Sequence, residues 1–286
     1  MRLLITGGLG LLGKEIDAVF RGRAEVRTTD RAEWDVTDPA ACRREVEGFR
    51  PDVVIHCAAY TAVDRAEGEA AMAHLLNVEG TRNVARACRE RGALMVTFGT
   101  DYIFDGASSH PYREEDAANP LSVYGKTKWA AEQAVREEGG HHLLVRTQWL
   151  FGPAGGNFIR TILAKGRKGD TLRVVSDQVG CPTFSRDLAD AVRKLLEADA
   201  RGTVHFSGEG ETSWFGLARH VLERSGLPTG SLFAARTRDL PYPAPRPAYS
   251  VLSKEKYHAI TGVFPRPWED AVGEYLGMIH PEGGAR

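Results

Sequence analysis

Short, continuously apolar runs alternate with segments of helical length through the first half of this chain. Strands that are apolar at successive residues are buried on both faces, as in parallel sheets covered by helices. Right-handed crossovers between such strands give a doubly wound α/β fold. The runs that predict strands are residues 3–6, 24–29, 53–57, 94–98 and 143–146, and helices are expected most clearly at 70–91 and 122–138.

A glycine-rich turn follows the first apolar run. Residues 6–13 read TGGLGLLG, and a helix is expected to begin at Leu11. Glycines let the backbone approach a pyrophosphate, and the free N–H groups and dipole of a helix N-terminus favour its charge. A glycine pattern alone is also compatible with a simple tight turn, but between a strand and a helix it predicts a Rossmann-type dinucleotide site. The glycines expected at the cofactor are Gly7, Gly10 and Gly13.

Asp30 ends the second apolar run, roughly twenty residues beyond the glycines, where an acid can accept from the adenosine ribose hydroxyls. An acid there repels a 2′-phosphate and favours NADH. Arg31 follows at once and can pair with that phosphate, which favours NADPH. The expected cofactor is therefore NADPH or NADH, and the structural alternative for Asp30 is a helix or turn cap.

Tyr124 and Lys128 are four residues apart near the start of an expected helix, so they share one helix face. A nearby ammonium favours the phenolate and lowers the pKa of a tyrosine, which can then protonate a carbonyl oxygen while hydride reaches the carbon. Thr100 follows the fourth apolar run, at the edge of the sheet where ligands bind. The structural alternative for Tyr124 and Lys128 is an ordinary amphipathic helix, and the alternative for Thr100 is a turn that ends a strand. In combination, these residues predict a catalytic set of Thr100, Tyr124 and Lys128.

Composition limits the expected partners. The 286 residues have a formal net charge of −1 and no apolar run of membrane-spanning length, so neither nucleic acid nor a membrane is an expected partner. The start MRLLITGG is too short an apolar run for a signal peptide. The cysteines show no metal-binding spacing, which favours reduced thiols, no metal and a cytoplasmic location. They are Cys42, Cys57, Cys88 and Cys181.

With these motifs, the chain resembles the extended short-chain dehydrogenase/reductase family and, within it, the dTDP-4-dehydrorhamnose reductases. The similarity extends over nearly the whole chain. The resemblance implies a Rossmann domain at 1–150 and a smaller C-terminal α/β substrate domain at 151–286, from which some segments return to the first. The matching stretches are TGGLGLLG, PDVVIHCAAYTAVDRAE, TDYIFDG, NPLSVYGKTKWAAE, RTQWLFG, NF at 157–158, DQVGCPT, RPAYSVL and PWEDAV.

The resemblance also implies ligand contacts. Arg246 is the candidate for a substrate diphosphate, because a guanidinium suits bidentate phosphate binding. A core aromatic and a helix cap are the structural alternatives for Trp149 and Asp64. The implied cofactor contacts are Leu11, Leu12, Asp35, Val36, Ala58, Ala59, Tyr60, Thr61, Tyr124 and Lys128. The implied substrate contacts are Val63, Asp64, Thr100, Asp101, Tyr102, Trp149 and Arg246.

The implied reaction is reduction of the 4-keto group of dTDP-4-dehydro-β-L-rhamnose to dTDP-β-L-rhamnose. In this reaction NAD(P)H supplies hydride and Tyr124 the proton, and the product serves cell-surface polysaccharide. Sugar-nucleotide dehydratases of the same superfamily have a glutamate where this chain has Tyr102. A phenol is a poor replacement for the carboxylic acid that expels water, so dehydration is not expected.

Two other functions remain open. One is reduction of another nucleotide-linked 4-ketosugar, because a few pocket changes can exchange one sugar for another. The other is a non-catalytic NADP-binding regulatory subunit, like that of methionine adenosyltransferase, which can retain the catalytic motif. Some relatives are described as Mg²⁺-linked dimers, but Arg186 falls where a carboxylate ligand would be expected, and a cation cannot bind the metal. We therefore expect a monomer or a weak homodimer.

Overall fold

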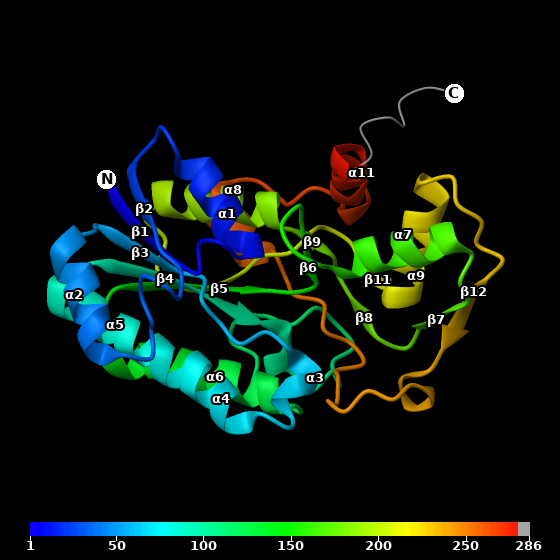
Figure 1. The fold of residues 1–286 in the computed structure, drawn as a ribbon, viewed down its shortest axis with the longest axis horizontal. Coiled ribbons are helices and arrows are strands. Elements are labelled where there is room, and N and C mark those ends of the chain that lie inside the picture. The colour runs from blue at the N-terminus through cyan, green and yellow to red at the C-terminus, as the bar shows by residue number, and fades with distance from the viewer. Residues whose placement is uncertain (280–286) are drawn as a thin grey trace.

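The computed structural model describes residues 1–279 (Figure 1). A parallel sheet lies at the centre of the larger part of the molecule. The order of its strands is β2-β1-β3-β4-β5-β10, and every pair is parallel. β2 lies on one side of β1, and the strands that follow it lie on the other side. This arrangement confirms the predicted doubly wound α/β fold. The strands are β1 (Arg2–Thr6), β2 (Glu25–Thr28), β3 (Val53–His56), β4 (Leu94–Thr100), β5 (His142–Thr147) and β10 (Gly202–His205).

Helices cover both faces of this sheet, as the apolar strands require. Successive side chains of β1 point to opposite faces. Ile5 packs in one core with Ile16 of α1 and Leu188 of α8, whereas Leu4 packs in another with Val84 of α5. The covering helices are α1 (Leu11–Phe20) and α8 (Ser185–Glu197) on the first face, and α2 (Pro39–Phe49), α5 (Gly80–Arg91) and α6 (Val123–Glu138) on the second.

The helix expected over 70–91 has an irregular middle. It consists of α4 (Ala70–His74), a π-helical turn at Leu75–Glu79, and α5. Such turns re-aim the side chains around them and often occur at functional sites. Asn77 in this turn is buried, and its amide donates to Thr127 Oγ1 on α6 at 3.0 Å. The irregular turn is therefore docked against the helix that carries Tyr124 and Lys128.

A second hydrophobic core lies beside the sheet, on the right in Figure 1, and shares no residue with the sheet cores. Leu163, Val221 and Tyr275 are among its buried side chains. Its helices are α7 (Phe158–Lys168), α9 (Trp214–Arg224) and α11 (Trp268–Ile279). Short strand pairs accompany them: β6 (Leu150–Phe151) with β9 (Thr183–Phe184), β7 (Leu172–Val175) with β12 (Leu232–Ala235), and β8 (Val179–Gly180) with β11 (Thr212–Ser213).

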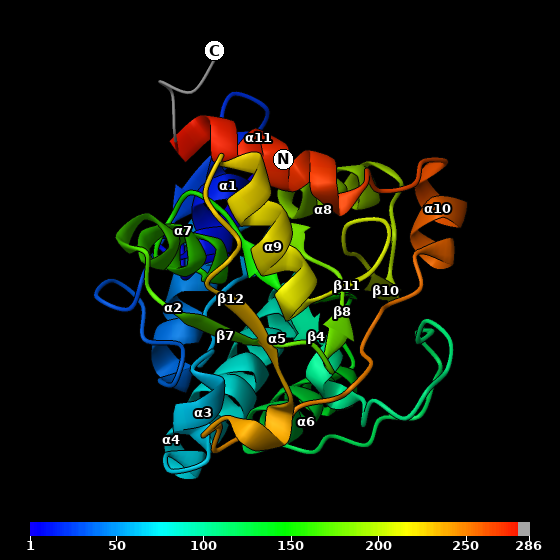
Figure 2. The ribbon, with the colours of Figure 1, turned by 90° about the vertical axis from the view of Figure 1, so that its right-hand side faces the viewer.

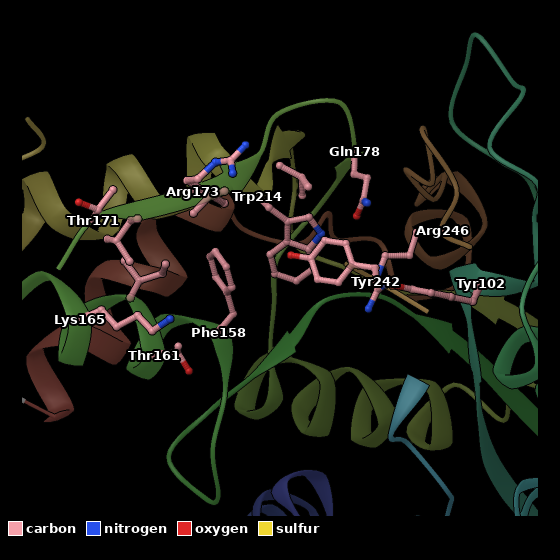
Figure 3. A pocket seen from close by; sticks show the side chains of 14 residues that line it. Tyr102, Phe158, Thr161, Lys165, Thr171, Arg173, Gln178, Trp214, Tyr242 and Arg246 are labelled. Atoms are coloured by element: carbon pink, nitrogen blue, oxygen red, sulfur yellow. The ribbon is translucent and has the colours of Figure 1, made fainter. Parts of the chain in front are cut away.

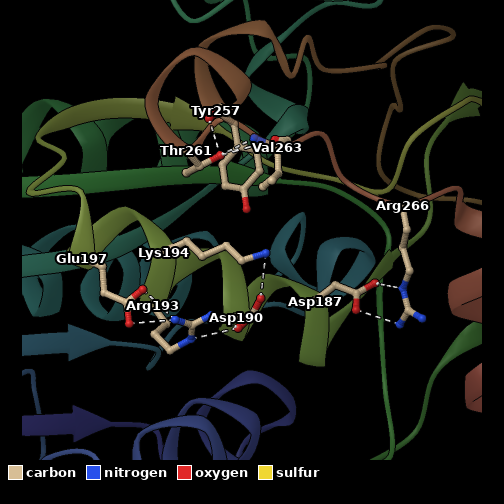
Figure 4. A network of polar contacts seen from close by, with 9 residues as sticks. All are labelled: Asp187, Asp190, Arg193, Lys194, Glu197, Tyr257, Thr261, Val263 and Arg266. Carbon is tan, nitrogen blue, oxygen red and sulfur yellow. Dashed lines mark hydrogen bonds and ion pairs between the residues drawn. The ribbon is translucent and has the colours of Figure 1, made fainter.

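The chain crosses between the two parts more than once. After β9 it returns to the sheet as α8 and β10, and later as α10 (Glu255–Thr261), which packs against α8 and β10 as seen in Figure 2. An ion pair of 2.7 Å from Arg266 to Asp187 ties α8 to the segment before α11 (Figure 4). We propose 1–150 and 151–286 as the domain division, with α8, β10 and α10 in the first domain; residues 280–286 lie outside the described part.

The proline-rich segment is an extended loop from residue 240 to the start of α10, apart from isolated bridges at Tyr249 and Leu252. We call residues 244–253 the 244–253 loop, and it runs between the two parts of the molecule. Within residues 1–279, no helix is both long and apolar enough to span a membrane.

Candidate active site

A cavity of about 330 Å³ lies at the carboxyl ends of β1, β2 and β3, and we call it the β2 cavity. This is the edge at which open α/β sheets bind nucleotides. It brings together residues that are more than 20 positions apart in the chain. The predicted cofactor residues that line it are Gly7, Gly10, Asp30, Arg31, Asp35, Val36, Ala58 and Ala59.

The glycine turn is packed so closely that side chains would not fit. Gly7 has a φ of +64°, and a Cβ added there would lie 2.8 Å from the backbone nitrogen of Ala58. A Cβ on Gly13 would overlap the carbonyl oxygen of Gly7. No side chain caps the N-terminus of α1, so its N–H groups remain directed at the cavity. These features fit the diphosphate of a dinucleotide.

Asp30 both braces this turn and lines the cavity. The backbone N–H groups of Leu9 and Arg31 donate to its two carboxylate oxygens at 3.0 and 2.7 Å. The capping alternative is therefore real, yet the side chain remains partly exposed at the cavity wall. Arg31 is exposed and lines the same cavity, so an acid and a base still face the expected ribose position together.

A second cavity, of about 440 Å³, lies at the ends of β4 and β5, beside the start of α6. We call it the β4 cavity. It adjoins the β2 cavity, because Gly7, Gly10, Cys57 and Ala59 line both. The other predicted residues that it brings together are Leu11, Leu12, Gly13, Thr61, Val63, Thr100, Asp101, Tyr102, Tyr124, Lys128 and Trp149.

Local features of the sequence bring Tyr124 beside Thr100. Ser122 caps α6, since its Oγ accepts from the backbone N–H of Gly125 at 3.1 Å. A Cβ on Gly125 would overlap the carbonyl oxygen of Tyr102, so glycine lets the helix start directly against the turn that follows Thr100. The rings of Tyr102 and Tyr124 meet edge to face at 5.6 Å. Tyr124 and Thr100 line the same cavity.

Burial controls the protonation of the catalytic candidates. It raises the pKa of Tyr124 to about 12, against a lowering by the neighbouring Thr100 hydroxyl. It lowers the pKa of Lys128 to about 8, against a raising by Glu132. The expectation that Lys128 draws down the pKa of Tyr124 is therefore wrong for this structure, because desolvation of the phenolate is the main cause of the shift and Lys128 is not among the groups that lower this pKa. Tyr124 is protonated at neutral pH, which is the form that a reductase needs.

Asp101 turns its carboxylate toward two hydroxyl groups. Thr100 Oγ1 donates to it at 3.1 Å and Ser250 Oγ at 2.6 Å. The side chain is only 1% exposed, and burial raises its pKa to about 6. Asp101 therefore lines the β4 cavity, as its implied role of substrate ligand requires, and it also binds Ser250 of the 244–253 loop.

A third cavity, of about 370 Å³, lies between α7, β7 and the proline-rich loop, and we call it the α7 cavity (Figure 3). Arg246 and Tyr102 lie at one end, and Lys165 at the other. A fourth cavity, of about 310 Å³, connects it to the β4 cavity. It shares Phe158 and Trp214 with the α7 cavity and Trp149 with the β4 cavity. The three cavities thus adjoin one another in a row with aromatic side chains in the middle, and we call this row the passage.

Trp149 has an unusual backbone conformation at this passage, with a φ of 45°. Its ring stacks on Trp214 at a centroid distance of 3.7 Å. A Cβ on Gly180 would lie 2.6 Å from the same ring, so the glycine of the DQVG stretch makes room for it. Strained residues that the surrounding structure holds in place are common in binding sites. This conformation favours a ligand-binding role for Trp149 over a purely structural one.

Arg246 is paired across the two parts of the molecule. Its Nη2 lies 2.7 Å from Oδ2 of Asp64, in α3 (Val63–Ala66), and its guanidinium lies over the Tyr242 ring at 4.3 Å. Asp64 therefore holds Arg246 rather than lining any of the four cavities. Tyr60 also lines none of them, because its hydroxyl donates to Glu69 at 2.6 Å.

Sequence reasoning missed most of the α7 cavity. Phe158 and Gln178 lie within the stretches NF and DQVGCPT, so the resemblance held a signal for them. The remaining residues come from segments that carry no recognisable motif. They include Lys165, Arg173, Trp214 and Tyr242.

The strand order, the glycine-lined cavity at the strand ends and the adjoining Thr100, Tyr124 and Lys128 define a short-chain reductase of the extended type. A family model described as "RmlD substrate binding domain" matches residues 1–280. The chain belongs to this family, and the predicted resemblance is confirmed.

Relatives with known names cover almost the full chain. A dTDP-4-dehydrorhamnose reductase from Streptomyces griseus is 41% identical over 99% of this chain and 95% of its own length. A probable dTDP-4,6-dihydroxy-2-methyloxan-3-one 4-ketoreductase from Streptomyces antibioticus is 38% identical over 98% of both chains. The solved structure of dTDP-4-dehydrorhamnose reductase from Bacillus anthracis in complex with NADP has a TM-score of 0.92 and 34% identity, over 96% of this chain and 98% of that one.

Arg186 makes ion pairs where a metal ligand would have been expected. It lies 3.4 Å from Glu15 and 3.1 Å from Glu274, and Arg266 pairs with Glu274 at 2.7 Å. In the described part of the chain, no group of three or more His, Cys, Asp or Glu side chains is arranged to hold a metal ion. The guanidinium groups already neutralise these carboxylates.

We expect removal of divalent cations to leave turnover unchanged, because arginines rather than a metal neutralise Glu15 and Glu274. The measurement is the reduction rate after dialysis against EDTA, compared with the rate after Mg²⁺ is added back. A rate that falls with EDTA and returns with Mg²⁺ would contradict this expectation.

Proposed function

We propose that this chain reduces the 4-keto group of dTDP-4-dehydro-β-L-rhamnose to dTDP-β-L-rhamnose, with NADPH or NADH as the hydride source. Its site of action would be the cytoplasm, its partner a small nucleotide sugar, and its state a monomer or weak homodimer. The product would supply deoxysugar for cell-surface polysaccharide. The observation that carries the proposal is the passage from Thr100, Tyr124 and Lys128 to the arginine and lysine of the α7 cavity.

The cofactor fits the two cavities at the strand ends. The glycine turn and the N-terminus of α1 would hold its diphosphate, and Asp30 would hold the adenosine ribose. Lys128 would bind the nicotinamide ribose hydroxyls from the floor of the β4 cavity, where its side chain is 8% exposed. When bound, the nicotinamide supplies the hydride.

Tyr124 supplies the proton. A tyrosine is already protonated at neutral pH, burial raises the pKa of Tyr124 further to about 12, and the side chain lines the β4 cavity with Thr100. When it protonates the 4-keto oxygen it becomes a phenolate. The Lys128 cation and the Thr100 hydroxyl would then stabilise that charge, in a site whose walls exclude much of the water.

The rest of the substrate extends toward the α7 cavity. The stacked rings of Trp149 and Trp214 line the passage and suit an apolar sugar face. Arg246 lies at the inner end of the α7 cavity, where a guanidinium can bind a diphosphate. Asp64 accepts a hydrogen bond from this guanidinium at 2.7 Å, so the direction of the Arg246 side chain would be set before substrate arrives.

We expect Asp30→Asn to shift the ratio of kcat/KM for NADPH over NADH toward NADPH by several-fold, because the charge that repels a 2′-phosphate is removed. The amide oxygen can still accept from the Leu9 N–H, so the turn is kept. Asp30→Ala removes charge and acceptor together and serves as the comparison. An unchanged ratio in the Asn variant would show that Asp30 does not select the cofactor.

Another ketosugar is the second candidate, since the Streptomyces antibioticus relative bears the name of a different 4-ketoreductase. The deciding experiment follows oxidation of NADPH and NADH by absorbance, with enzymatically generated dTDP-4-dehydrorhamnose as substrate and product analysis for dTDP-rhamnose. Substrate-dependent oxidation with that product supports the proposal. Cofactor binding without oxidation would favour another ketosugar or the regulatory-subunit alternative.

A further inference from the structure

A chain of hydrogen bonds leads from Thr100 to the 244–253 loop. Ser250 Oγ donates to Asp101 Oδ2 at 2.6 Å, and Thr100 Oγ1 donates to Asp101 Oδ1 at 3.1 Å. Asp101 and Ser250 are 1% and 2% exposed, so water does not compete for these bonds. One buried carboxylate is thus shared between two hydroxyl donors that are 150 residues apart in the chain.

The position of Ser250 is fixed by its backbone. Its N–H donates to the carbonyl of Val179 at 2.8 Å, and the N–H of Val179 donates to the carbonyl of Ala248 at 2.8 Å. The same loop carries Arg246, which lines the α7 cavity. Ser250 is therefore linked through its hydroxyl to the turn after β4, and through the chain to Arg246.

The Thr100 hydroxyl has one proton and two neighbours that compete for it. Asp101 accepts this proton in the structure, and Tyr124 lines the β4 cavity together with Thr100. While Tyr124 keeps its own proton, it needs no donor, and Thr100 can remain bonded to Asp101. Once Tyr124 becomes a phenolate it needs a donor, and Thr100 can serve only if Asp101 gives up the bond.

We propose that Ser250 is a positioning residue for the reduction: by holding Asp101, it frees the Thr100 hydroxyl to turn toward the Tyr124 phenolate. Without Ser250, the carboxylate would have Thr100 as its only side-chain donor and would retain that proton. The inference rests on the proposed function, because it requires Tyr124 to be the proton donor.

Ser250→Ala is expected to lower kcat about tenfold, the effect of one lost hydrogen bond to a charged group, without changing KM or NADPH affinity. A merely loosened loop would instead raise KM, because Arg246 lies on it. Ser250→Thr keeps the hydroxyl and should recover most of the rate. Ser207→Ala is the matched control, since this buried serine donates to the carbonyl of Gly208 at 3.0 Å and lines none of the four cavities.

A double-mutant cycle shows whether Ser250 acts through Thr100. Thr100→Val removes the hydroxyl, so adding Ser250→Ala to it should cause no further loss of kcat. An equal loss in both backgrounds, or a raised KM with unchanged kcat, would overturn the proposal.

A crystal structure of the Ser250→Ala variant supplies a readout that does not depend on activity. The Asp101 carboxylate should rotate toward Thr100 and shorten their 3.1 Å contact. An unmoved carboxylate would overturn the proposal. If wild-type protein leaves the ketosugar unreduced, the proposed function fails, and this structure still decides whether Ser250 positions Asp101.

Discussion

Tyr124→Phe is expected to lower kcat for ketosugar reduction by a factor of about 10²–10⁴, the usual contribution of a general acid. The substitution removes the phenolic proton and retains the ring that meets Tyr102 at 5.6 Å. The variant has no hydroxyl to donate a proton. Because burial raises the pKa of Tyr124 to about 12, the wild-type side chain is protonated throughout the neutral range, so the loss of rate should persist across that range. Steady-state kinetics gives kcat, and nicotinamide fluorescence gives cofactor affinity, which should be unchanged.

Tyr257→Phe is the matched control. Tyr257 is a buried tyrosine on α10 that lines none of the four cavities, and we expect the native rate from this variant. A Tyr124→Phe enzyme that reduces the ketosugar at the native rate would refute the role of Tyr124. Weakened cofactor binding would instead indicate a structural defect in the β4 cavity.

Gly7→Ala is expected to weaken NADPH binding by at least about tenfold and to reduce the free energy of unfolding by about 2–4 kcal/mol. The alanine Cβ would lie 2.8 Å from the backbone nitrogen of Ala58, and this residue has a φ of +64°. The turn and the end of β3 would have to separate, which moves both walls of the β2 cavity. Thermal unfolding and fluorescence titration with NADPH measure the two effects.

Gly22→Ala separates backbone strain from crowding. Gly22 has a φ of +82°, and no atom lies within 4 Å of the position of an added Cβ. This variant should show only the strain, about 1–2 kcal/mol, with NADPH binding unchanged. If Gly7→Ala binds NADPH as tightly as Gly22→Ala does, the glycine turn does not hold the cofactor.

Much of the fold could be predicted from local sequence. Apolar runs identified β1, β3, β4 and β5, because burial on both faces leaves no polar alternation. The run at 24–29 also coincides with β2, although Glu25–Thr28 is mostly exposed. The last strand, β10, was missed: Gly202–His205 is short, and only two of its residues are buried. The limits of the helical segment at 70–91 were predicted correctly. Its π-helical turn was not predicted, because the turn is held by the hydrogen bond from Asn77 to Thr127 of α6, 50 residues away.

The sequence predicted the motifs of the candidate site, but it did not predict the contacts between residues that are far apart in the chain. Spacing alone placed Tyr124 and Lys128 on one helix face, and the glycine pattern predicted the turn of the β2 cavity. The partner of Arg246 is Asp64, 182 residues away, and no local pattern pairs them. The pKa of Tyr124 was predicted in the wrong direction, because burial is a property of the assembled site.

The sequence by itself determined the elements and the reacting groups, because hydrophobic periodicity, glycine conformation and side-chain chemistry are local properties. Only the tertiary structure decided how these groups act on one another. Packing α6 against the turn after β4 brings Tyr124 into the same cavity as Thr100, and the 244–253 loop adds Ser250 to the Thr100–Asp101 pair. Desolvation and hydrogen-bond competition arise from neighbours distant in the chain, and they set the protonation on which the chemistry depends.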